Sequence, residues 1–381
     1  MRIELPPAVS FLIAALERGG FEAYVVGGCV RDSLMGRPPA DWDVCTSALP
    51  AQVNRCFAGH RTVETGLKHG TVTLVLDRTP YEITTYRVDG AYADNRRPDR
   101  VTFVTRLSDD LARRDFTINA MAYSDGAGLV DLFGGRDDLR RGLVRCVGDP
   151  DRRFGEDALR MLRALRFASV LNFSVDTPTG ASIVKNRALL KNIAAERINA
   201  ELSGLLRGEK PEALSVVADV LFPELGAVDW AAVGRVPRDL VTRLAALLRG
   251  VGADAARAAL LRLKYDRDTI GKVAALVAYS GAPLEATPVQ VKCLLREIGA
   301  EAVCRLADLR GVAGVRELVD AAVRRGDCYS LAGLAVNGDD LIAAGMPPGR
   351  AIRQTLEALL DQVIAGTLEN ERETLLKFIK R

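Results

Sequence analysis

Two aspartates one residue apart, Asp41 and Asp43 in "ADWDV", are the first candidates for chemistry in this chain. The apolar residue that follows predicts a short strand, and residues i and i+2 of a strand lie on one face. Two carboxylates on one face could clamp one hard cation or hold two about 4 Å apart, which would activate an attacking hydroxyl and neutralise a departing pyrophosphate. A turn with two solvated acids is the alternative, because Asp-x-Asp is not specific to metal sites.

A pair of glycines precedes the aspartates, in "VVGGCVRD". Gly27 and Gly28 would let the backbone approach a ligand closely, and N–H groups at the start of the helix expected there could bind phosphate. Arg31 lies one helical turn further on and could contact the same phosphates. No Gly-Lys-Ser/Thr follows, so the stretch is not a P-loop, and a purely structural turn stays open.

Other metal ligands are scarce. The chain has only two histidines, and its seven cysteines include no Cys-x-x-Cys pair. A histidine-based metal site, a Ser-His-Asp triad, a disulfide framework and structural zinc are therefore all disfavoured. Any metal is expected on carboxylates, which indicates Mg²⁺ or another hard ion.

Arginine is concentrated in one part of the chain, although the formal net charge is only +3. The clusters are "DNRRPDR", "LARRDF", "GRDDLRRGLVR" and "DRRFGEDALRMLRALRF". Any one of them could be solvated surface charge. Four clusters within one segment indicate a ligand rich in phosphate.

The 381 residues are too many for one hydrophobic core, and the pattern of apolar residues changes along the chain. Up to about residue 145, short β-branched or aromatic runs alternate with helical stretches, which predicts an α+β domain on one small mixed sheet. From Glu156 onward, Leu, Ala, Arg and Glu recur at helical spacing and strand signals almost vanish. The expected strands lie at 23–26, 71–76, 81–87, 101–104 and 128–133.

No apolar run approaches the roughly 20 residues that span a membrane. The N-terminal "VSFLIAAL" is more typical of an amphipathic helix than of a signal peptide, since it lacks a basic lead-in and a cleavage site. These features favour a cytoplasmic protein with no membrane partner.

Five motifs occur in an order that resembles one family. "GGCVRD" followed by "ADWDV" is similar to the signature of the nucleotidyltransferase superfamily, in the branch of tRNA CCA-adding enzymes and bacterial poly(A) polymerases. "RRDFTINAMAY", "EDALRMLRALRFA" and "ERINAEL" resemble three further motifs of that branch. The stretch from "VNGDDLIAAG" to "TLEN" resembles the tRNA-binding tail of the CCA-adding enzymes.

This resemblance implies a domain order. It predicts a nucleotidyltransferase head at 1–145, followed by an all-α neck at 146–210 that carries the nucleobase-recognition helix. A helical body at 211–325 and a tRNA-binding tail at 326–381 would complete the chain.

Asp157 and Arg160 are three residues apart on a predicted helix, so we expect their side chains to be neighbours. Such a spacing usually means a surface ion pair. Cytosine and adenine, however, each present an amino donor beside a ring-nitrogen acceptor, which a carboxylate and a guanidinium would match. Guanine and uracil present the reverse pattern. A mismatch would leave buried polar groups unpaired, and discrimination of roughly 10⁴ or more could follow.

The resemblance assigns this base-reading role to Asp157 and Arg160. It implies further nucleotide contacts from Arg163 and Arg166, of which Arg166 is the less well placed because the stripe winds around the helix. Arg114 in "RRDF" matches the family's triphosphate contact, with a cap or an ion pair to Asp115 as the alternative.

Two features bear on the subtype. "RVDGAYADNRRPDRVTF" resembles a flexible loop that enzymes adding only CC are expected to lack. Full CCA addition and addition of the terminal A alone both stay open. Glu82 is a possible third acid for the metal site, although it could equally be a glutamate on the strand surface.

The sequence thus predicts a template-independent enzyme that adds CCA to tRNA 3′ ends from CTP and ATP with Mg²⁺, grips the acceptor arm and uses no DNA. "PPGRAIRQ" could begin a helix that binds tRNA phosphates, or a Pro-capped structural helix. The alternatives are an A-adding enzyme, a bacterial poly(A) polymerase and an inactive RNA-binding module.

Overall fold

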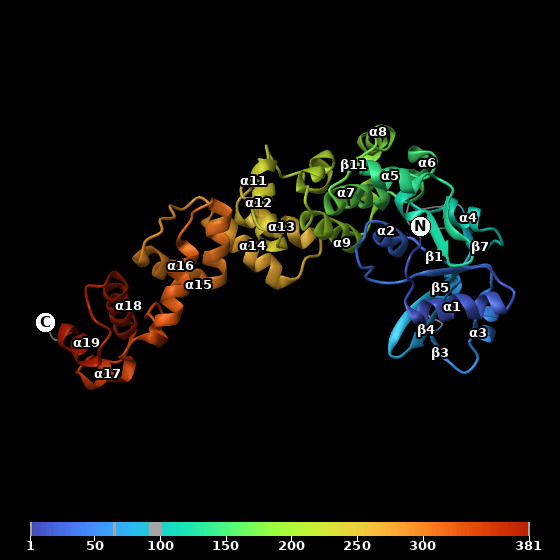
Figure 1. Cartoon of the computed structure of the whole chain (residues 1–381). Helices are drawn as coiled ribbons and strands as arrows, with labels where there is room; N and C mark the ends of the chain where they lie inside the picture. The colour runs from blue at the N-terminus through green and yellow to red at the C-terminus, as the bar shows by residue number, and fades with distance from the viewer. Residues whose placement is uncertain (1, 64–65, 91–100, 380–381) are drawn as a thin grey trace. The chain divides into compact units, whose positions relative to one another are not determined.

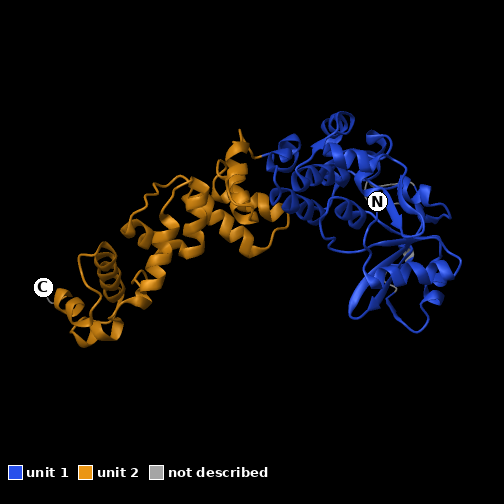
Figure 2. Ribbon diagram, viewed as in Figure 1, with its two compact units in different colours: residues 1–223 blue, residues 224–381 orange. Residues whose placement is uncertain are grey.

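A computed structural model describes residues 2–63, 66–90 and 101–379, apart from the side chains of Lys68 and Asp89. The chain divides into two compact units, residues 1–223 and 224–381, which are described separately (Figure 2). The four-part division expected from the sequence stays a prediction. The boundary after Pro223 falls within the segment expected to be the body.

The first unit contains a seven-stranded sheet with the order β3-β4-β5-β2-β1-β8-β9. The β2–β5 pair is parallel and the other pairs are antiparallel, so the sheet is mixed as predicted. Its strands are β1 (Ala23–Val26), β2 (Val44–Thr46), β3 (Arg61–Val63), β4 (Thr71–Leu76), β5 (Thr79–Thr85), β8 (Met121–Ser124) and β9 (Gly128–Asp131).

The first helix, α1 (Pro7–Arg18), packs against the sheet (Figure 1). Proline at its first position fixes a helical φ, and Val9, Leu12 and Leu16 recur on one face. These side chains are fully buried and share one core with Val25 of β1 and residues of the neighbouring strands. The helix therefore covers the sheet where β1 and β2 lie.

Short elements complete the head. β6 (Arg87–Asp89) and β7 (Val101–Phe103) pair as an antiparallel ladder, with Arg87 opposite Phe103. Residues 91–100 of the loop that was singled out in the sequence lie outside the described residues. The helical segments are α2 (Gly28–Leu34), α3 (Pro50–Cys56), η1 (Leu67–His69), α4 (Leu107–Ala112), η2 (Thr117–Asn119) and α5 (Gly135–Arg141).

The rest of the first unit is helical, apart from the two-residue strands β10 (Leu143–Val144) and β11 (Ser174–Val175), which pair in parallel. The long helix α7 (Leu159–Leu171) packs along α9 (Ala195–Leu206). Buried Leu162 and Leu165 of α7 and Leu202 of α9 contribute apolar surface. The other helices are α6 (Pro150–Glu156), α8 (Thr177–Asn186), η3 (Arg187–Asn192), η4 (Pro211–Val216) and α10 (Ala218–Leu221).

The second unit contains no strand among its described residues. Its long helix α15 (Pro288–Arg310) is interrupted at Gly299, where φ is 76° and ψ is 164°. The remaining helices are α11 (Trp230–Arg235), α12 (Leu240–Leu248), α13 (Ala253–Arg262), α14 (Arg267–Tyr279), α16 (Val315–Arg325), η5 (Leu331–Gly333), α17 (Gly338–Ala343), α18 (Arg350–Ala365) and α19 (Arg372–Ile379). The predicted fold class, an α+β head followed by helices, is confirmed. None of the described helices is both long enough and apolar enough for a bilayer span.

Candidate active site

Asp41 and Asp43 lie directly before β2 rather than on it, so the strand predicted through both residues was wrong in its start. The pairing with β1 nevertheless reaches Asp43, because the Val26 N–H donates to the Asp43 carbonyl oxygen at 3.0 Å. Both aspartates are exposed to solvent. The sheet therefore fixes the backbone at Asp43 and leaves the two carboxylates accessible to a ligand.

Glu82 lies beside this pair. The parallel register of β2 and β5 sets Val44 opposite Ile83, which brings Glu82 next to Asp43. Desolvation by the surrounding protein is the main reason that the pKa of Asp43 is raised to about 6; the carboxylates of Asp41 and Glu82 raise it further, and Arg114 opposes the rise. Accumulated negative charge of this kind favours a cation.

The described residues contain no group of three or more His, Cys, Asp or Glu side chains that could hold a metal ion. A cation at Asp41 and Asp43 would therefore need further oxygen ligands from water or a bound nucleotide. This donor set suits Mg²⁺, which proteins usually bind through one or two carboxylates together with substrate phosphates.

The glycine turn lies against Arg114. Gly27 has φ 84° and ψ −129°, a conformation that favours glycine, and Gly28 is the first residue of α2. A Cβ atom on Gly27 would lie 3.2 Å from Nη1 of Arg114. The turn thus leaves room for this guanidinium.

Arg114 pairs with Asp110 (Nη2–Oδ2, 3.2 Å) rather than with Asp115, the partner considered from the sequence. Its Nε atom is buried and has no hydrogen-bond partner among the described residues. A buried donor without a partner is rare. It marks Arg114 as a group with capacity for an anion beside the glycine turn.

Hydrogen bonds to neighbouring side chains fix the guanidinium of Arg31. Its Nε and Nη2 atoms donate to the two carboxylate oxygens of Asp32 at 2.9 Å, and Nη1 donates to Oδ1 of Asn119 at 2.8 Å. The guanidinium also lies 5.2 Å from the ring centroid of Phe167 on α7. Arg31 therefore connects α2 to the region of α7.

Asp157 and Arg160 are not neighbours on one continuous helix, so this part of the prediction was wrong. α6 ends at Glu156, α7 begins at Leu159, and Asp157 between them is extended with φ −139° and ψ 104°. Its carboxylate accepts a hydrogen bond from the N–H of Leu159 at 3.1 Å. A short acidic side chain that satisfies a free N–H at a helix start favours such a break.

The two residues also have separate ionic partners. Asp157 pairs with Arg197 of α9 (Nη2–Oδ2, 2.8 Å). Arg160, which is buried, pairs with Glu156 (Nη1–Oε2, 2.8 Å), and Glu156 also binds Arg153 at 2.7 Å. The carboxylate and the guanidinium are thus held independently of each other.

Arg163 and Arg166 share one acid. Arg163 binds Asp115 (Nη2–Oδ2, 2.7 Å) and Glu201 (Nη1–Oε1, 3.2 Å), and Arg166 binds the other oxygen of Glu201. Asp115 raises the pKa of the Arg163 guanidinium. Both guanidinium groups also lie near the ring of Phe167, at 5.5 and 4.4 Å from its centroid.

Several polar residues of this region were not singled out from the sequence. Arg197 and Glu201 both fall in "ERINAEL", a motif that the resemblance had marked without assigning roles. Asp110, Asn119 and Glu156 carried no signal beyond their positions within or beside other motifs. Asp110 and Glu156 pair with arginines three or four residues away, a spacing that is common on helices. The partners of Arg197 and Glu201, and Arg31 as a partner of Asn119, are distant in sequence, so only the fold reveals them.

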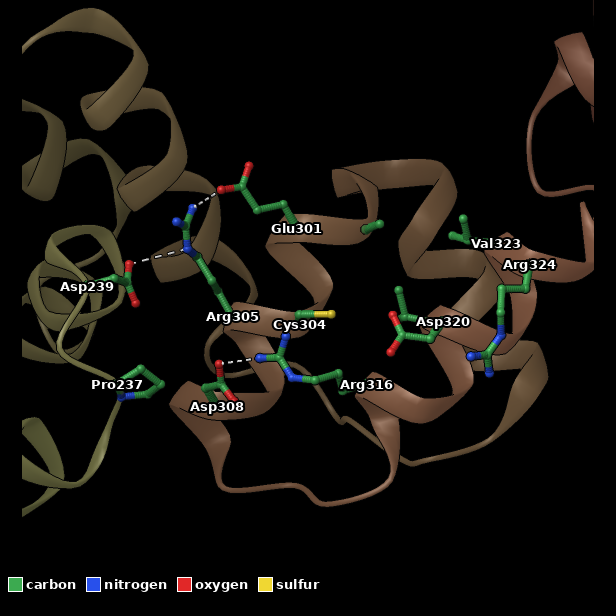
Figure 3. Close-up of a pocket in the computed structure, with 12 residues that line it drawn as sticks. Pro237, Asp239, Glu301, Cys304, Arg305, Asp308, Arg316, Asp320, Val323 and Arg324 are labelled. Atoms are coloured by element: carbon green, nitrogen blue, oxygen red, sulfur yellow. Dashed lines mark hydrogen bonds and ion pairs between the residues drawn. The ribbon is translucent and has the colours of Figure 1, made fainter.

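The second unit has a cavity of its own, with a volume of about 700 Å³ (Figure 3). Arg305 crosses one side and pairs with Glu301 at 2.8 Å and with Asp239, the N-cap of α12, at 3.3 Å. Arg316 pairs with Asp308 at 2.8 Å. Charged side chains alternate with small apolar ones around the cavity, namely Pro237, Asp239, Ala300, Glu301, Cys304, Arg305, Asp308, Arg316, Val319, Asp320, Val323 and Arg324. No residue of it was predicted from the sequence as a site.

Three known protein families match successive parts of the chain. A "Poly A polymerase head domain" matches residues 23–145, a "Probable RNA and SrmB-binding site of polymerase A" matches 172–227, and a putative "tRNA nucleotidyltransferase domain 2" matches 241–379. With the mixed sheet and its exposed aspartates, these matches define the chain as a nucleotidyltransferase with a head of the poly(A) polymerase type.

Full-length relatives narrow the class. The CCA-adding enzyme of Limosilactobacillus fermentum is 39% identical over 99% of this chain and 98% of its own. That of Geobacillus kaustophilus is 40% identical over 97% and 95%. The solved CCA-adding enzyme of Bacillus stearothermophilus in complex with CTP has a TM-score of 0.80 at 32% identity, over 99% and 98%. The chain belongs to the family of CCA-adding enzymes.

A Thermotoga maritima CCA-adding enzyme, solved in complex with tRNA_CCA, is also similar in structure. Its TM-score is 0.72 at 22% identity, over 99% of this chain and 96% of that one. At this identity the similarity supports the fold.

Proposed function

We propose that this protein adds CCA to the 3′ ends of tRNA, using CTP and ATP without a nucleic-acid template and releasing pyrophosphate. The observation that carries the proposal is identity of 39% to a CCA-adding enzyme along almost the entire length of both chains. The relative solved with CTP supports the nucleotide substrate. The proposal includes a cytoplasmic location.

Asp41 and Asp43 are the residues that would hold divalent cations, and we assign Mg²⁺ and a two-ion arrangement to them. The carboxylates of Asp41 and Glu82, which add to the desolvation that raises the pKa of Asp43, support a cation here. Bound there, the ions would favour deprotonation of the primer 3′-hydroxyl and neutralise the charge of the pyrophosphate. The hydroxyl then attacks the α-phosphate in line, and pyrophosphate leaves.

Gly28, Arg31 and Arg114 would bind the triphosphate. The unpartnered Nε of Arg114 beside the glycine turn supports this role, because a phosphate oxygen would satisfy it. Arg31 would have to share its guanidinium with Asp32. We therefore expect Arg114 to contribute more than Arg31 to nucleotide affinity.

Asp157 and Arg160 would read the base, the former by accepting from the amino group and the latter by donating to the ring nitrogen. Their separate ionic partners support the role, because neither group neutralises the other. Arg163 and Arg166 would act on the nucleotide through the charge that they add around Phe167.

The second unit would hold the acceptor arm of tRNA. α18 begins at Arg350, directly after Pro-Pro-Gly, and Arg350 and Arg353 of its first turn are exposed. Guanidinium groups at such a place suit backbone phosphates of RNA, a contact that is largely independent of sequence.

An incorporation assay tests the proposal and separates it from its alternatives. The purified protein is incubated with labelled tRNA that ends before CCA, or in CC, with CTP, ATP or both. CTP alone should extend the first substrate by two residues, and ATP should add one more. Extension of tRNA ending in CC alone would indicate an A-adding enzyme, and continued addition of A would indicate a poly(A) polymerase. Binding of tRNA without extension would indicate an inactive module.

A further inference from the structure

Arg197 of α9 reaches the carboxylate of Asp157 from a helix that is separate from both α6 and α7. The distances are 2.8 Å from Nη2 to Oδ2 and 3.4 Å from Nη1 to Oδ1. Both side chains are mostly buried, with 29% of Arg197 and 15% of Asp157 exposed. The pair is therefore shielded from solvent much more than an ordinary surface ion pair.

The bonds to Asp157 fix its orientation. Oδ1 also accepts the N–H of Leu159 at 3.1 Å, so donors from two elements hold the plane of the carboxylate. A carboxylate oxygen can accept two hydrogen bonds. Among the described residues Oδ2 receives one, from Arg197, and it can accept another from an incoming amino group.

We propose that Arg197 is a positioning residue for nucleotide selection, which holds the Asp157 carboxylate so that Oδ2 accepts from the amino group of cytosine or adenine. The inference rests on the proposed base-reading role of Asp157 and Arg160. In this arrangement Arg197 acts through Asp157 and does not touch the base.

The Asp157 carboxylate needs a counter-ion other than Arg160, because Arg160 is itself bonded elsewhere. Its Nη1 atom donates to Glu156 at 2.8 Å and to the carbonyl oxygen of Arg153 at 3.3 Å. If Arg160 instead bonded Asp157, the acceptor and the donor that read the base would satisfy each other. Arg197 gives Asp157 an alternative partner, and the packing of α9 along α7 fixes where that partner stands.

The test is a cycle of three full-length variants, Arg197→Met, Asp157→Ala and the double variant, in which kcat/KM is measured for CTP and UTP on tRNA lacking CCA. Arg197→Met should lower the CTP:UTP selectivity at least tenfold, mainly through a higher KM for CTP. In the Asp157→Ala background it should have no further effect, because it acts through that carboxylate. Arg197→Lys keeps the charge but not the two-pronged geometry, so it should recover only part of the selectivity.

Arg187→Met is the control, because Arg187 of η3 also forms an ion pair with an aspartate, Asp219 (3.2 Å), and no role in nucleotide selection is assigned to it. It should leave selectivity unchanged, and thermal unfolding of each variant checks that folding is intact. Suppose that Asp157→Ala loses selectivity as expected. Unchanged selectivity in Arg197→Met, or an equal effect of Arg197→Met with and without Asp157, would then overturn the inference. If Asp157→Ala also keeps full selectivity, the base-reading assignment itself fails.

Discussion

Asp110 holds two adjacent arginines, one with each carboxylate oxygen. Oδ1 lies 2.9 Å from Nη2 of Arg113, and Oδ2 lies 3.2 Å from Nη2 of Arg114. The aspartate is fully buried in the first turn of α4, and it also accepts the N–H of Arg87 at 3.3 Å. One acid therefore fixes the arginine that we assign to the triphosphate.

Asp110→Asn should destabilise the first unit and weaken nucleotide binding together. Removal of the charge takes away the carboxylate that both mostly buried guanidinium groups bond, which costs about 3 kcal/mol of unfolding free energy. Urea denaturation would measure the loss, and CTP titration at a temperature where the variant is folded would measure the affinity. A variant with wild-type stability and affinity would contradict this role.

Asp41→Ala should lower incorporation by roughly a thousandfold or more, since it removes one of the two carboxylates proposed to hold the ions. Binding of tRNA should stay within a factor of about two, because the phosphate contacts that dominate RNA affinity are elsewhere. Rapid-quench incorporation and filter binding would measure the two quantities. Asp137→Ala, which removes an exposed acid paired with Arg140 on α5, is the matched control and should change neither.

Chelation by EDTA should stop incorporation, and added Mg²⁺ should restore it. The melting temperature of the first unit should change little, because its core is built from apolar side chains beneath the sheet. Activity that persists in excess EDTA would remove the metal assignment from Asp41 and Asp43.

Arg160→Ala should widen base selection more than it weakens triphosphate binding. Loss of the donor to the ring nitrogen should lower the CTP:UTP ratio roughly a hundredfold. Arg152→Ala is a matched control, since Arg152 pairs with the same Glu156 at 3.0 Å but is 78% exposed. Equal fidelity of the two variants in single-nucleotide assays would reject the proposed reader.

Gly27→Ala should raise the KM for CTP and ATP. The backbone conformation at Gly27 costs other residues of order 1–3 kcal/mol, and the new Cβ would press on Arg114 at 3.2 Å. Gly59→Ala carries a comparable backbone strain, with φ 96° and no atom within 4 Å of the added Cβ. Gly59→Ala should lower stability without a change in KM. If it raised the KM for CTP and ATP as much as Gly27→Ala does, backbone strain rather than pressure on Arg114 would explain the effect of Gly27→Ala.

The sequence predicted the fold class because its local signals agree with the structure. Strands at 23–26, 71–76 and 128–131 follow the β-branched runs, and helical spacing dominates after Glu156. The predicted start of β2 was wrong, since Asp43 lies outside the strand although its backbone carbonyl oxygen still accepts the Val26 N–H and so extends the pairing with β1. Local residue preferences do not distinguish a residue within a strand from one that only pairs beside its end.

The contacts of the site were much less predictable. Arg31 bonds Asn119 and Arg163 bonds Asp115, across 88 and 48 residues of chain. Spacing along the sequence favoured Asp157 and Arg160 as a pair on one helix, but the helix is interrupted at Asp157, whose carboxylate satisfies the N–H of Leu159. The types of residue in a site could therefore be inferred, whereas their partners depend on how α7, α9 and the sheet pack.

Phe167 is the common neighbour of Arg31, Arg163 and Arg166, whose guanidinium carbons lie 5.2, 5.5 and 4.4 Å from its ring centroid. The negative face of an aromatic ring attracts cations, so Phe167 adds a further attraction to three guanidinium groups that each also pair with a carboxylate, of Asp32, Asp115 or Glu201. An uncharged residue thereby helps to keep three cations in one place. Selection of candidate residues by polarity alone would overlook it.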